Sequence, residues 1–435
     1  MNSENQRFLS FINAAPTAWH AVSLLTDRLA QSGFTPLEEG ARWELEAGGR
    51  YYVTRNRSSL IAFVLPAAAP AGMMIAAAHS DSPTFKLKAN PELGACDRYI
   101  RLNAEPYGGM LMSTWLDRPL SVAGRLLVRE GGELVTRLVA CDRDLCVIPN
   151  VAIHMNREAN NGFAWKANVD LLPLWGSEQA AGSVLATVAE AAGVDPRDVA
   201  GHGLYLYNRV PGRVWGAREE YLSGGRLDDL ECAWSCAEAL IAAPATDRLP
   251  VCCVFDNEEV GSGTRQGADA SFLEDVIERL CAFYGMDAAD RQRLIAGSML
   301  VSADNAHAVH PNHPEYSDPA NRVWMNAGVV IKHSARQKYT TDAVSCGLFS
   351  EICHGAGVPV QHFANRSDMP GGSTLGNLAI RHVALPAVDI GLAQLAMHSA
   401  WETAGALDLP LMLRALTAFY AAPLTLLGDG RYRLG

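Results

Sequence analysis

The sequence lacks several features that mark common classes of protein. Its 10 cysteines are scattered, with no CxxC pair of the kind that binds zinc or carries out redox chemistry. Lys and Arg number 36 against 47 Asp and Glu, and the net charge of -11 argues against non-specific binding to nucleic acid, which needs a basic surface. The polar segment of residues 1–7 contains no signal-peptide core. We therefore expect a protein of the reducing cytoplasm.

Long uninterrupted hydrophobic runs are also missing. Residues 61–78 are 18 positions without a charge, but Pro66, Pro70 and Gly72 interrupt them. Because proline and glycine disfavour a continuous helix, we predict two strands joined by a short loop here. The expected partners therefore include neither a membrane nor nucleic acid.

Two adjacent carboxylates, Glu258 and Glu259, follow the short apolar run of residues 251–255. One of them can bind a metal while the other accepts a proton from water, and Gly261 lets the backbone turn sharply. Most Glu-Glu pairs are solvated surface charge, so the pair alone leaves both interpretations open.

Other residues that commonly bind metals stand in a similar setting. His79 ends one apolar run, Asp304 follows a second, and His398 comes shortly after a third. Such runs, separated by helix-like stretches, are typical of the buried strands of an α/β sheet. Ligands of open α/β sheets gather beyond the carboxyl ends of the strands, so we expect these side chains to lie close together.

Two roles are open for Asp228. It precedes a segment with apolar residues at helical spacing, from Leu230 to Ile241, where an aspartate commonly caps the helix. Since Asp229 follows directly, one carboxylate can cap the helix while the other points into a site.

The content of turns and the alternation of polar and apolar residues differ between segments of the chain. Residues 90–224 are rich in turns and alternate polar with apolar side chains, with a hairpin turn predicted at residues 130–133. Strand and helix alternation precedes and follows this segment. We therefore predict an α/β catalytic domain formed by residues 1–89 and 225–435, with a β-rich domain, residues 90–224, inserted between its two halves.

Five motifs along the chain resemble those of the aspartyl aminopeptidase family of dinuclear zinc exopeptidases. They are His79-Ser80-Asp81, Arg226-Leu227-Asp228-Asp229-Leu230, Asp256-Asn257-Glu258-Glu259-Val260-Gly261-Ser262, Ser302-Ala303-Asp304-Asn305-Ala306-His307 and Ala396-Met397-His398-Ser399. The segment Thr17-Ala18-Trp19-His20-Ala21-Val22 is similar to the family's opening motif. The resemblance covers nearly the whole chain. It implies a mixed central sheet flanked by helices, and an inserted domain for dimerisation and substrate gating.

The resemblance also implies a metal site. It implies two Zn²⁺ ions per subunit, for which Mn²⁺ or Co²⁺ can substitute, since imidazole and carboxylate ligands suit all three. Asp228 would bridge the ions and each histidine would bind one of them. The implied ligands are His79, Asp228, Glu259, Asp304 and His398.

Two further residues receive catalytic roles from the resemblance. Glu258 would be the general base that takes a proton from water and returns it to the leaving amine. Asp81 would orient the ring of His79. The implied reaction is release of the N-terminal residue, acidic (Asp or Glu) by the family's name, from short peptides.

The remaining candidates carry alternatives. His154 is either an ordinary strand histidine, a contact to substrate in a partner's active site, or a metal ligand. Lys332 and Lys338 are either solvated surface or the positive groups of a specificity pocket. Gly372, in a turn of two glycines, permits close approach of substrate to the backbone.

The alternatives for function concern both chemistry and class. Another dinuclear zinc hydrolase, a deacylase or a carboxypeptidase, would share the ligand set. A non-catalytic assembly protein on the same fold would bind no metal. By analogy with the family we expect a homo-oligomer, built from dimers that assemble into a dodecamer.

Overall fold

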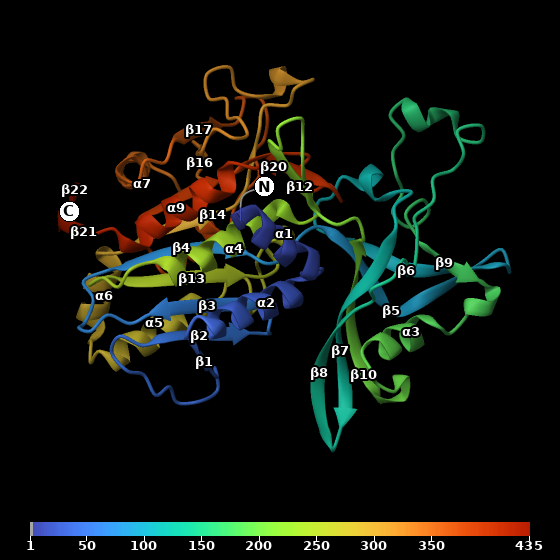
Figure 1. Cartoon of the computed structure of the whole chain (residues 1–435), viewed down its shortest axis with the longest axis horizontal. Coiled ribbons are helices and arrows are strands. Elements are labelled where there is room, and N and C mark those ends of the chain that lie inside the picture. The colour runs from blue at the N-terminus through green and yellow to red at the C-terminus, as the bar shows by residue number, and fades with distance from the viewer. Residues whose placement is uncertain (1–2) are drawn as a thin grey trace.

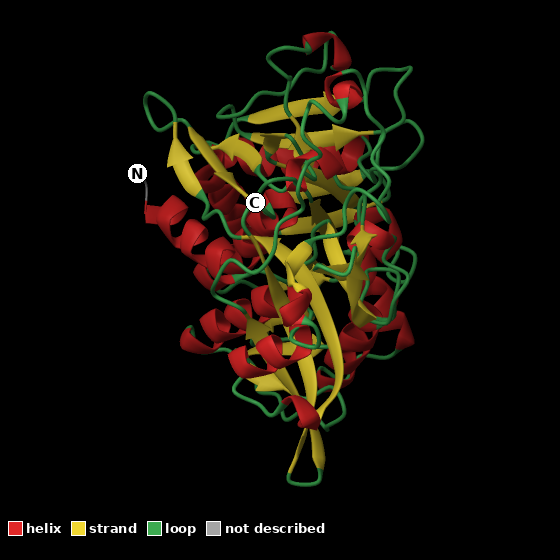
Figure 2. Ribbon diagram, turned by 90° about the vertical axis from the view of Figure 1, so that its right-hand side faces the viewer, coloured by secondary structure: helices red, strands yellow, loops and turns green. Residues whose placement is uncertain are grey.

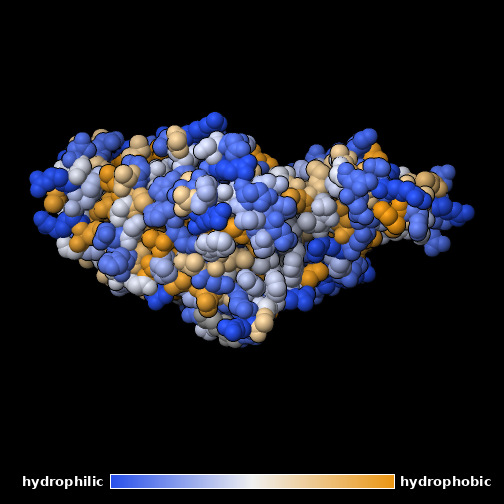
Figure 3. Space-filling view, turned by 90° about the horizontal axis from the view of Figure 1, so that it is seen from above, coloured by the Kyte–Doolittle hydropathy of each residue, from blue (hydrophilic) through white to orange (hydrophobic). Residues whose placement is uncertain are grey.

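The protein, described here by a computed structural model over residues 3–435, consists of two connected parts (Figure 1). The larger part contains a nine-stranded sheet with helices on both faces, and the smaller part contains a six-stranded sheet. Seen from above, the molecule is elongated, with the smaller part forming the narrower end at the right (Figure 3).

The nine-stranded sheet is mixed, which confirms the predicted fold class. Strands β13, β4, β14 and β18 run parallel to one another, whereas β2–β3, β3–β13 and β16–β18 are antiparallel pairs. In spatial order the strands are β1 (Thr35–Leu37), β2 (Arg50–Arg55), β3 (Ser59–Val64), β13 (Leu249–Phe255), β4 (Met73–His79), β14 (Met299–Ala303), β18 (Ala387–Gly391), β16 (Val329–His333) and β17 (Val360–Ala364).

The central strands are buried on both faces, as their apolar sequences predict. Every residue of β4, β13, β14 and β18 is buried. One face packs against α1 (Ser3–Ala14), α2 (Ala18–Gln31), α4 (Leu227–Ala242), α7 (Ala343–Gly355) and α9 (Asp408–Ala421). The other face packs against α5 (Phe272–Phe283), α6 (Ala288–Ala296) and α8 (Gly376–Ala379).

The uncharged segment of residues 61–78 contributes two strands, as predicted. Strand β3 ends at Val64 and β4 begins at Met73, with the prolines and Gly72 in the connection between them. Among residues 3–435, no helix combines the length and apolar character that crossing a membrane requires.

The six-stranded sheet is antiparallel throughout. In spatial order it contains β8 (Glu133–Ala140), β7 (Leu120–Glu130), β10 (Val199–Asn208), β5 (Thr84–Ala95), β6 (Tyr99–Tyr107) and β9 (Leu174–Ser177), and α3 (Val184–Ala191) packs against it. Glu130 pairs with Glu133, so the predicted hairpin turn is confirmed, and Gly131 and Gly132 supply the positive φ angles that such a turn needs. This hairpin projects beyond the rest of the molecule (Figures 1 and 2).

A third sheet joins distant parts of the chain. It contains β11 (Arg213–Trp215), β12 (Tyr221–Gly224), β20 (Glu402–Gly405), β19 (Ala393–Leu395) and β15 (Ala306–His307). Strands β11 and β12 fall within residues 90–224 but pair with the C-terminal part, while β5 of the six-stranded sheet begins at Thr84. We propose that the insertion corresponds to the segment that forms the six-stranded sheet, residues 84–208. The hairpin β21 (Leu424–Gly428) and β22 (Arg431–Leu434) completes the chain.

Candidate metal centre

The candidate ligands gather at the carboxyl ends of the parallel strands. His79 is the last residue of β4, and its register partner Phe255 is the last residue of β13. The Glu258-Glu259 pair lies in a short 3-10 helix after β13, and Asp304 directly follows β14. Because these strands run parallel, their carboxyl ends lie at the same edge of the sheet, as the sequence predicted.

The five candidates belong to two groups that share Asp228, and a third group joins His79 and Glu259 to Glu258. His79, Asp228 and Asp304, together with Asp229, offer ligand atoms within 4.8 Å of one another. Asp228, Glu259 and His398 form a second such group. Each oxygen of Asp228 faces a different histidine: Oδ1 lies 3.5 Å from Nε2 of His79, and Oδ2 lies 3.4 Å from Nε2 of His398. A carboxylate placed in this way can bridge two metal ions.

The capping role considered for Asp228 is not seen. Asp228 and Asp229 have non-helical φ and ψ angles at a kink near the start of α4, and the carboxylate of Asp228 faces the histidines instead of the helix backbone.

Main-chain carbonyls hold both histidine rings. Nδ1 of His79 lies 3.1 Å from the carbonyl oxygen of Asp81, and Nδ1 of His398 lies 2.5 Å from that of Gly109. Such contacts place the imidazole proton on Nδ1 and leave Nε2 free to bind a metal. Both Nε2 atoms point towards Asp228.

The carboxylate of Asp81 holds the loop of the Glu pair. It accepts the backbone N–H of Glu258 at 3.0 Å and that of Glu259 at 3.2 Å, and the hydroxyl of Tyr107 donates to it at 2.7 Å. Its Oδ1 also lies 3.4 Å from Nδ1 of His79. Asp81 therefore contacts the ring through its carbonyl and positions the two glutamates through its carboxylate.

Burial and the charges of neighbouring residues shift the pKa values of the carboxyl groups at the site. Burial raises the pKa of Glu258 to about 8, and the negative charges of Asp304 and Asp81 add to the effect. Burial likewise raises the pKa of Asp304 to about 6, against the opposing charge of Lys332. For Asp228 the effect of burial is overcome by the neighbouring rings of His398 and His79, which lower its pKa. Crowded buried carboxylates of this kind favour a cation between them.

Unpaired oxygens support the fit of a metal ion to these residues. Among the described residues, Asp228 Oδ1, Asp229 Oδ1 and Glu259 Oε1 are buried without a hydrogen-bond partner. A buried carboxylate oxygen without a partner is costly unless a cation binds it. Together with the imidazole and carboxylate donor set, these oxygens fit zinc.

Two further residues of the site were not among the predicted ligands or catalytic residues. Asp229 accepts the backbone N–H of His79 at 3.0 Å, and the Asp-Asp pair was its signal. Glu402 accepts the backbone N–H of Asp228 at 3.2 Å and that of His398 at 2.8 Å, and thus ties two ligands together. Burial raises the pKa of Glu402 to about 8. Nothing in the local sequence distinguishes it from a surface glutamate.

The lysine candidates lie in different surroundings. Lys332 is buried, and its ammonium donates to the carbonyl oxygens of Asp304 at 2.7 Å and of Asn305 at 3.3 Å. It is therefore neither solvated surface nor free to enter a pocket. Lys338 is exposed in the loop after β16.

The other two substrate candidates are exposed. Gly372 lies in the loop before α8, with open space where a Cβ would stand. His154 lies in a turn of the loop between β8 and β9, so the interpretation as a strand histidine is wrong.

A cavity of about 710 Å³ borders the segment that leads into the Glu pair. Its lining includes Asp81, Tyr107, Asp256 and the segment from Thr17 to Trp19. None of the five candidate ligands lines this cavity, so the ligands face a different space.

Two groups of histidine and carboxylate ligands lie at the carboxyl edge of an α/β sheet. This arrangement is typical of metallohydrolases. The chain belongs to the M18 family of zinc aminopeptidases, because the family model described as aminopeptidase I zinc metalloprotease (M18) matches residues 11–420. The sequence resemblance is thus confirmed, and the chain is a zinc metallopeptidase of the aminopeptidase kind.

Relatives and solved structures agree with this assignment. The chain is 42% identical over 423 residues to a probable M18 family aminopeptidase 2 of Clostridium acetobutylicum, covering 95% of this chain and 98% of the relative. A protein of the same name from Pseudomonas aeruginosa (strain UCBPP-PA14) is 41% identical over 427 residues, covering 96% and 98%.

Two solved structures are similar over nearly the whole chain. A chain of the Ape4 and Nbr1 complex is 34% identical with a TM-score of 0.93, covering 96% of this chain and 85% of that one. A chain of the S. cerevesiae mApe1 dodecamer is 29% identical with a TM-score of 0.84, covering 96% of each.

Proposed function

We propose that the protein releases the N-terminal residue from short peptides, with two zinc ions held on either side of Asp228. The observation that carries this proposal is the direction of the Asp228 oxygens, one towards each histidine. His79 and Asp304 would complete one ligand set, and Glu259 and His398 the other. Zinc bound there would polarise the first peptide carbonyl and lower the pKa of a water molecule, and Mn²⁺ or Co²⁺ could supply the same chemistry.

Glu258 is the proposed general base. Its carboxylate lies beside the candidate ligands but belongs to neither of the two ligand groups that contain Asp228. The carboxylate of Asp81 accepts the backbone N–H of Glu258 and so fixes its position. In the reaction Glu258 accepts a proton from the attacking water and passes it to the amine that leaves.

The preference for an acidic N-terminal residue is part of the proposal, with Lys338 and Gly372 as substrate contacts. Their two loops share an anchor: Asp389 accepts the hydroxyl of Thr340 at 2.6 Å, and the hydroxyl of Thr374 also donates to it. Asp389 lies in β18, which neighbours β14 and thus Asp304. Lys338 brings an ammonium that is free of ion pairs among the described residues. Lys332, by contrast, would act on substrate only through Asp304.

We also propose a homo-oligomer built from dimers in the cytoplasm, up to a dodecamer such as that of the yeast relative. The loop between β8 and β9 projects from the six-stranded sheet (Figure 1). Its apolar side chains are unusually exposed, with Met155 at 83%, Val169 at 59% and Val151 at 52%. Exposed apolar groups in one loop favour a protein partner. His154 lies among them, so we assign it a contact with substrate in the partner's site rather than a metal.

An assay of one peptide in two forms tests the reaction. A peptide with a free N-terminus should be hydrolysed at its first bond, whereas the same peptide with an acetylated N-terminus should not. Cleavage of the acetylated form alone would indicate a deacylase, and cleavage from the other end a carboxypeptidase. A protein without zinc or turnover would be a non-catalytic assembly protein.

A series of aminoacyl substrates tests the specificity. With Asp or Glu at the first position, kcat/KM should exceed that for Ala or Leu. Replacing Lys338 with Met should remove most of this difference. An unchanged preference in the Lys338→Met variant would contradict the assignment of Lys338.

A further inference from the structure

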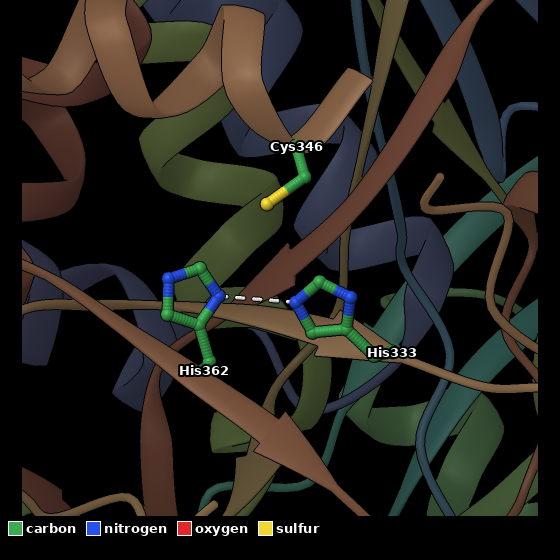
Figure 4. Close-up of side chains that lie close together, drawn as sticks. All are labelled: His333, Cys346 and His362. Atoms are coloured by element: carbon green, nitrogen blue, oxygen red, sulfur yellow. Dashed lines mark hydrogen bonds between the residues drawn. The ribbon is translucent and has the colours of Figure 1, made fainter. Parts of the chain in front are cut away.

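Three metal-binding side chains gather at a second place, away from the catalytic ligands (Figure 4). They are His333 at the end of β16, His362 in β17 and Cys346 in the first turn of α7. Each offers a ligand atom within 4.8 Å of the others. Nε2 of His333 lies 3.0 Å from Nδ1 of His362, and the sulfur of Cys346 points towards the two rings (Figure 4).

The topology brings these residues together. Strands β16 and β17 run parallel, and His362 is the register partner of Ile331. Because side chains alternate along a strand, His333 lies on the same face as Ile331 and therefore beside His362. Helix α7 covers this face, where its Phe349 packs in one core with Ile331, and this places Cys346 over the two rings.

The cluster is separate from the catalytic centre. It shares no residue with the two groups around Asp228. Lys332, the neighbour of His333, points to the opposite face of β16, where its ammonium binds the carbonyl oxygen of Asp304. The two sites are therefore divided by the strand itself.

We propose that His333, Cys346 and His362 bind a zinc-type divalent ion, with a fourth position open to water. Two imidazoles and one thiolate form a donor set for zinc and similar transition metals. His362 is exposed and the other two are partly exposed, so an ion can enter from solvent. The two rings already face each other through nitrogen atoms, and the hydrogen bond between them shows that one of these nitrogens carries a proton and the other a lone pair.

Binding of the ion requires that one proton leave the site and one move within it. The thiol of Cys346 loses its proton to solvent and becomes the thiolate that binds the ion. The ring that donates the hydrogen bond moves its proton to its other nitrogen, so both imidazoles bind in the neutral form. Burial lowers the pKa of His333, which keeps this ring neutral and ready to bind near pH 7.

Cobalt distinguishes this site from the catalytic one. The proposed catalytic ligands are nitrogen and oxygen atoms only, so a thiolate-to-cobalt absorption band in the near ultraviolet can come only from a cysteine site. The full-length protein, stripped of metal and titrated with Co²⁺ under reducing conditions, should develop this band. Equilibrium dialysis should give one more bound ion per chain than in the Cys346→Ser variant.

Two variants and a control complete the test. Cys346→Ser should abolish the band, and His362→Ala should weaken ion binding at this site by tenfold or more. Cys96→Ser, which removes an exposed free cysteine in the turn between β5 and β6, should leave both measurements unchanged. Equal ion counts in the wild type and both variants, or a band that survives Cys346→Ser, would overturn the proposal. These readouts do not depend on peptidase activity, so they succeed or fail independently of the proposed reaction.

Discussion

The carboxylate of Asp81 accepts the backbone N–H of Glu258 at 3.0 Å. The same carboxylate accepts the N–H of Glu259, while the carbonyl of Asp81 holds the ring of His79. One residue at the end of β4 thus positions a proposed base and two proposed ligands.

Replacing Asp81 with Asn should therefore impair catalysis more than folding. An amide offers one acceptor oxygen where the carboxylate offers two, so one N–H of the Glu pair loses its partner. We expect kcat or zinc affinity to fall by about 10–100-fold, as is usual for residues that orient metal ligands. Tyr107→Phe, which removes only the hydroxyl that donates to Asp81, is the matched control and should have a smaller effect. Equal activity of wild type and Asp81→Asn would contradict the assignment.

Zinc should stabilise the protein increasingly as the pH rises from 6 to 8. Without metal, the raised pKa values of Glu258, about 8, and Asp304, about 6, mean that these groups favour folding only when protonated. This contribution is complete below the ordinary pKa of a carboxyl group and is lost as the pH rises through the folded values. A bound dication offsets both the burial and the repulsion that disfavour the charged carboxylates.

Thermal unfolding at several pH values measures this effect. The difference in melting temperature between the zinc-loaded and the chelator-treated protein should grow between pH 6 and pH 8. A difference that shrinks over this range would contradict the assignment of the buried carboxylates to a metal site.

Lys332→Met should destabilise the protein and weaken zinc binding. The substitution leaves two carbonyl oxygens unpaired and removes the positive charge 3.7 Å from Oδ2 of Asp304. Removing one partner of a buried ion pair typically costs about 3–5 kcal/mol. Lys338→Met changes an exposed residue and should alter the free energy of unfolding by no more than about 0.5 kcal/mol. Denaturant unfolding compares the two variants, and equal stabilities would refute the supporting role of Lys332.

His154→Ala should lose turnover while keeping its zinc and its oligomeric state. The residue is exposed in the projecting loop and forms no part of either ligand group. Metal analysis, size-exclusion chromatography and kinetics on one preparation separate the alternatives. Loss of zinc would make His154 a ligand, and unchanged turnover would remove it from the site.

The sequence predicted those features of the site that depend only on a short local pattern of residues. Buried strands read as apolar runs, so the positions of His79 and Asp304 at strand ends followed from local patterns. Glu402 could not be found in this way, because its role depends on the backbone of Asp228, which is remote in the chain. The burial of Lys332 could not be predicted either, because the inward direction of its side chain depends on how β16 faces Asp304.

The end of the inserted domain could not be predicted from the local sequence either. Strands β11 and β12 are short and follow turns, so their sequences resemble those of the β-rich segment before them. Only the pairing of β12 with β20, near the other end of the chain, supports the boundary that we propose. Long-range pairing of this kind leaves no local signal.

The most direct test of the central claim is a comparison of zinc content and turnover for Glu258→Gln and the wild type. The glutamine keeps the size of the side chain but cannot accept the proton from water. The account predicts two zinc ions per chain in both proteins and a fall in kcat of about 10²–10⁴-fold in the variant, the usual contribution of a general base. Turnover retained at the wild-type rate would contradict it, and so would loss of zinc together with activity, which would make Glu258 a ligand and not the base.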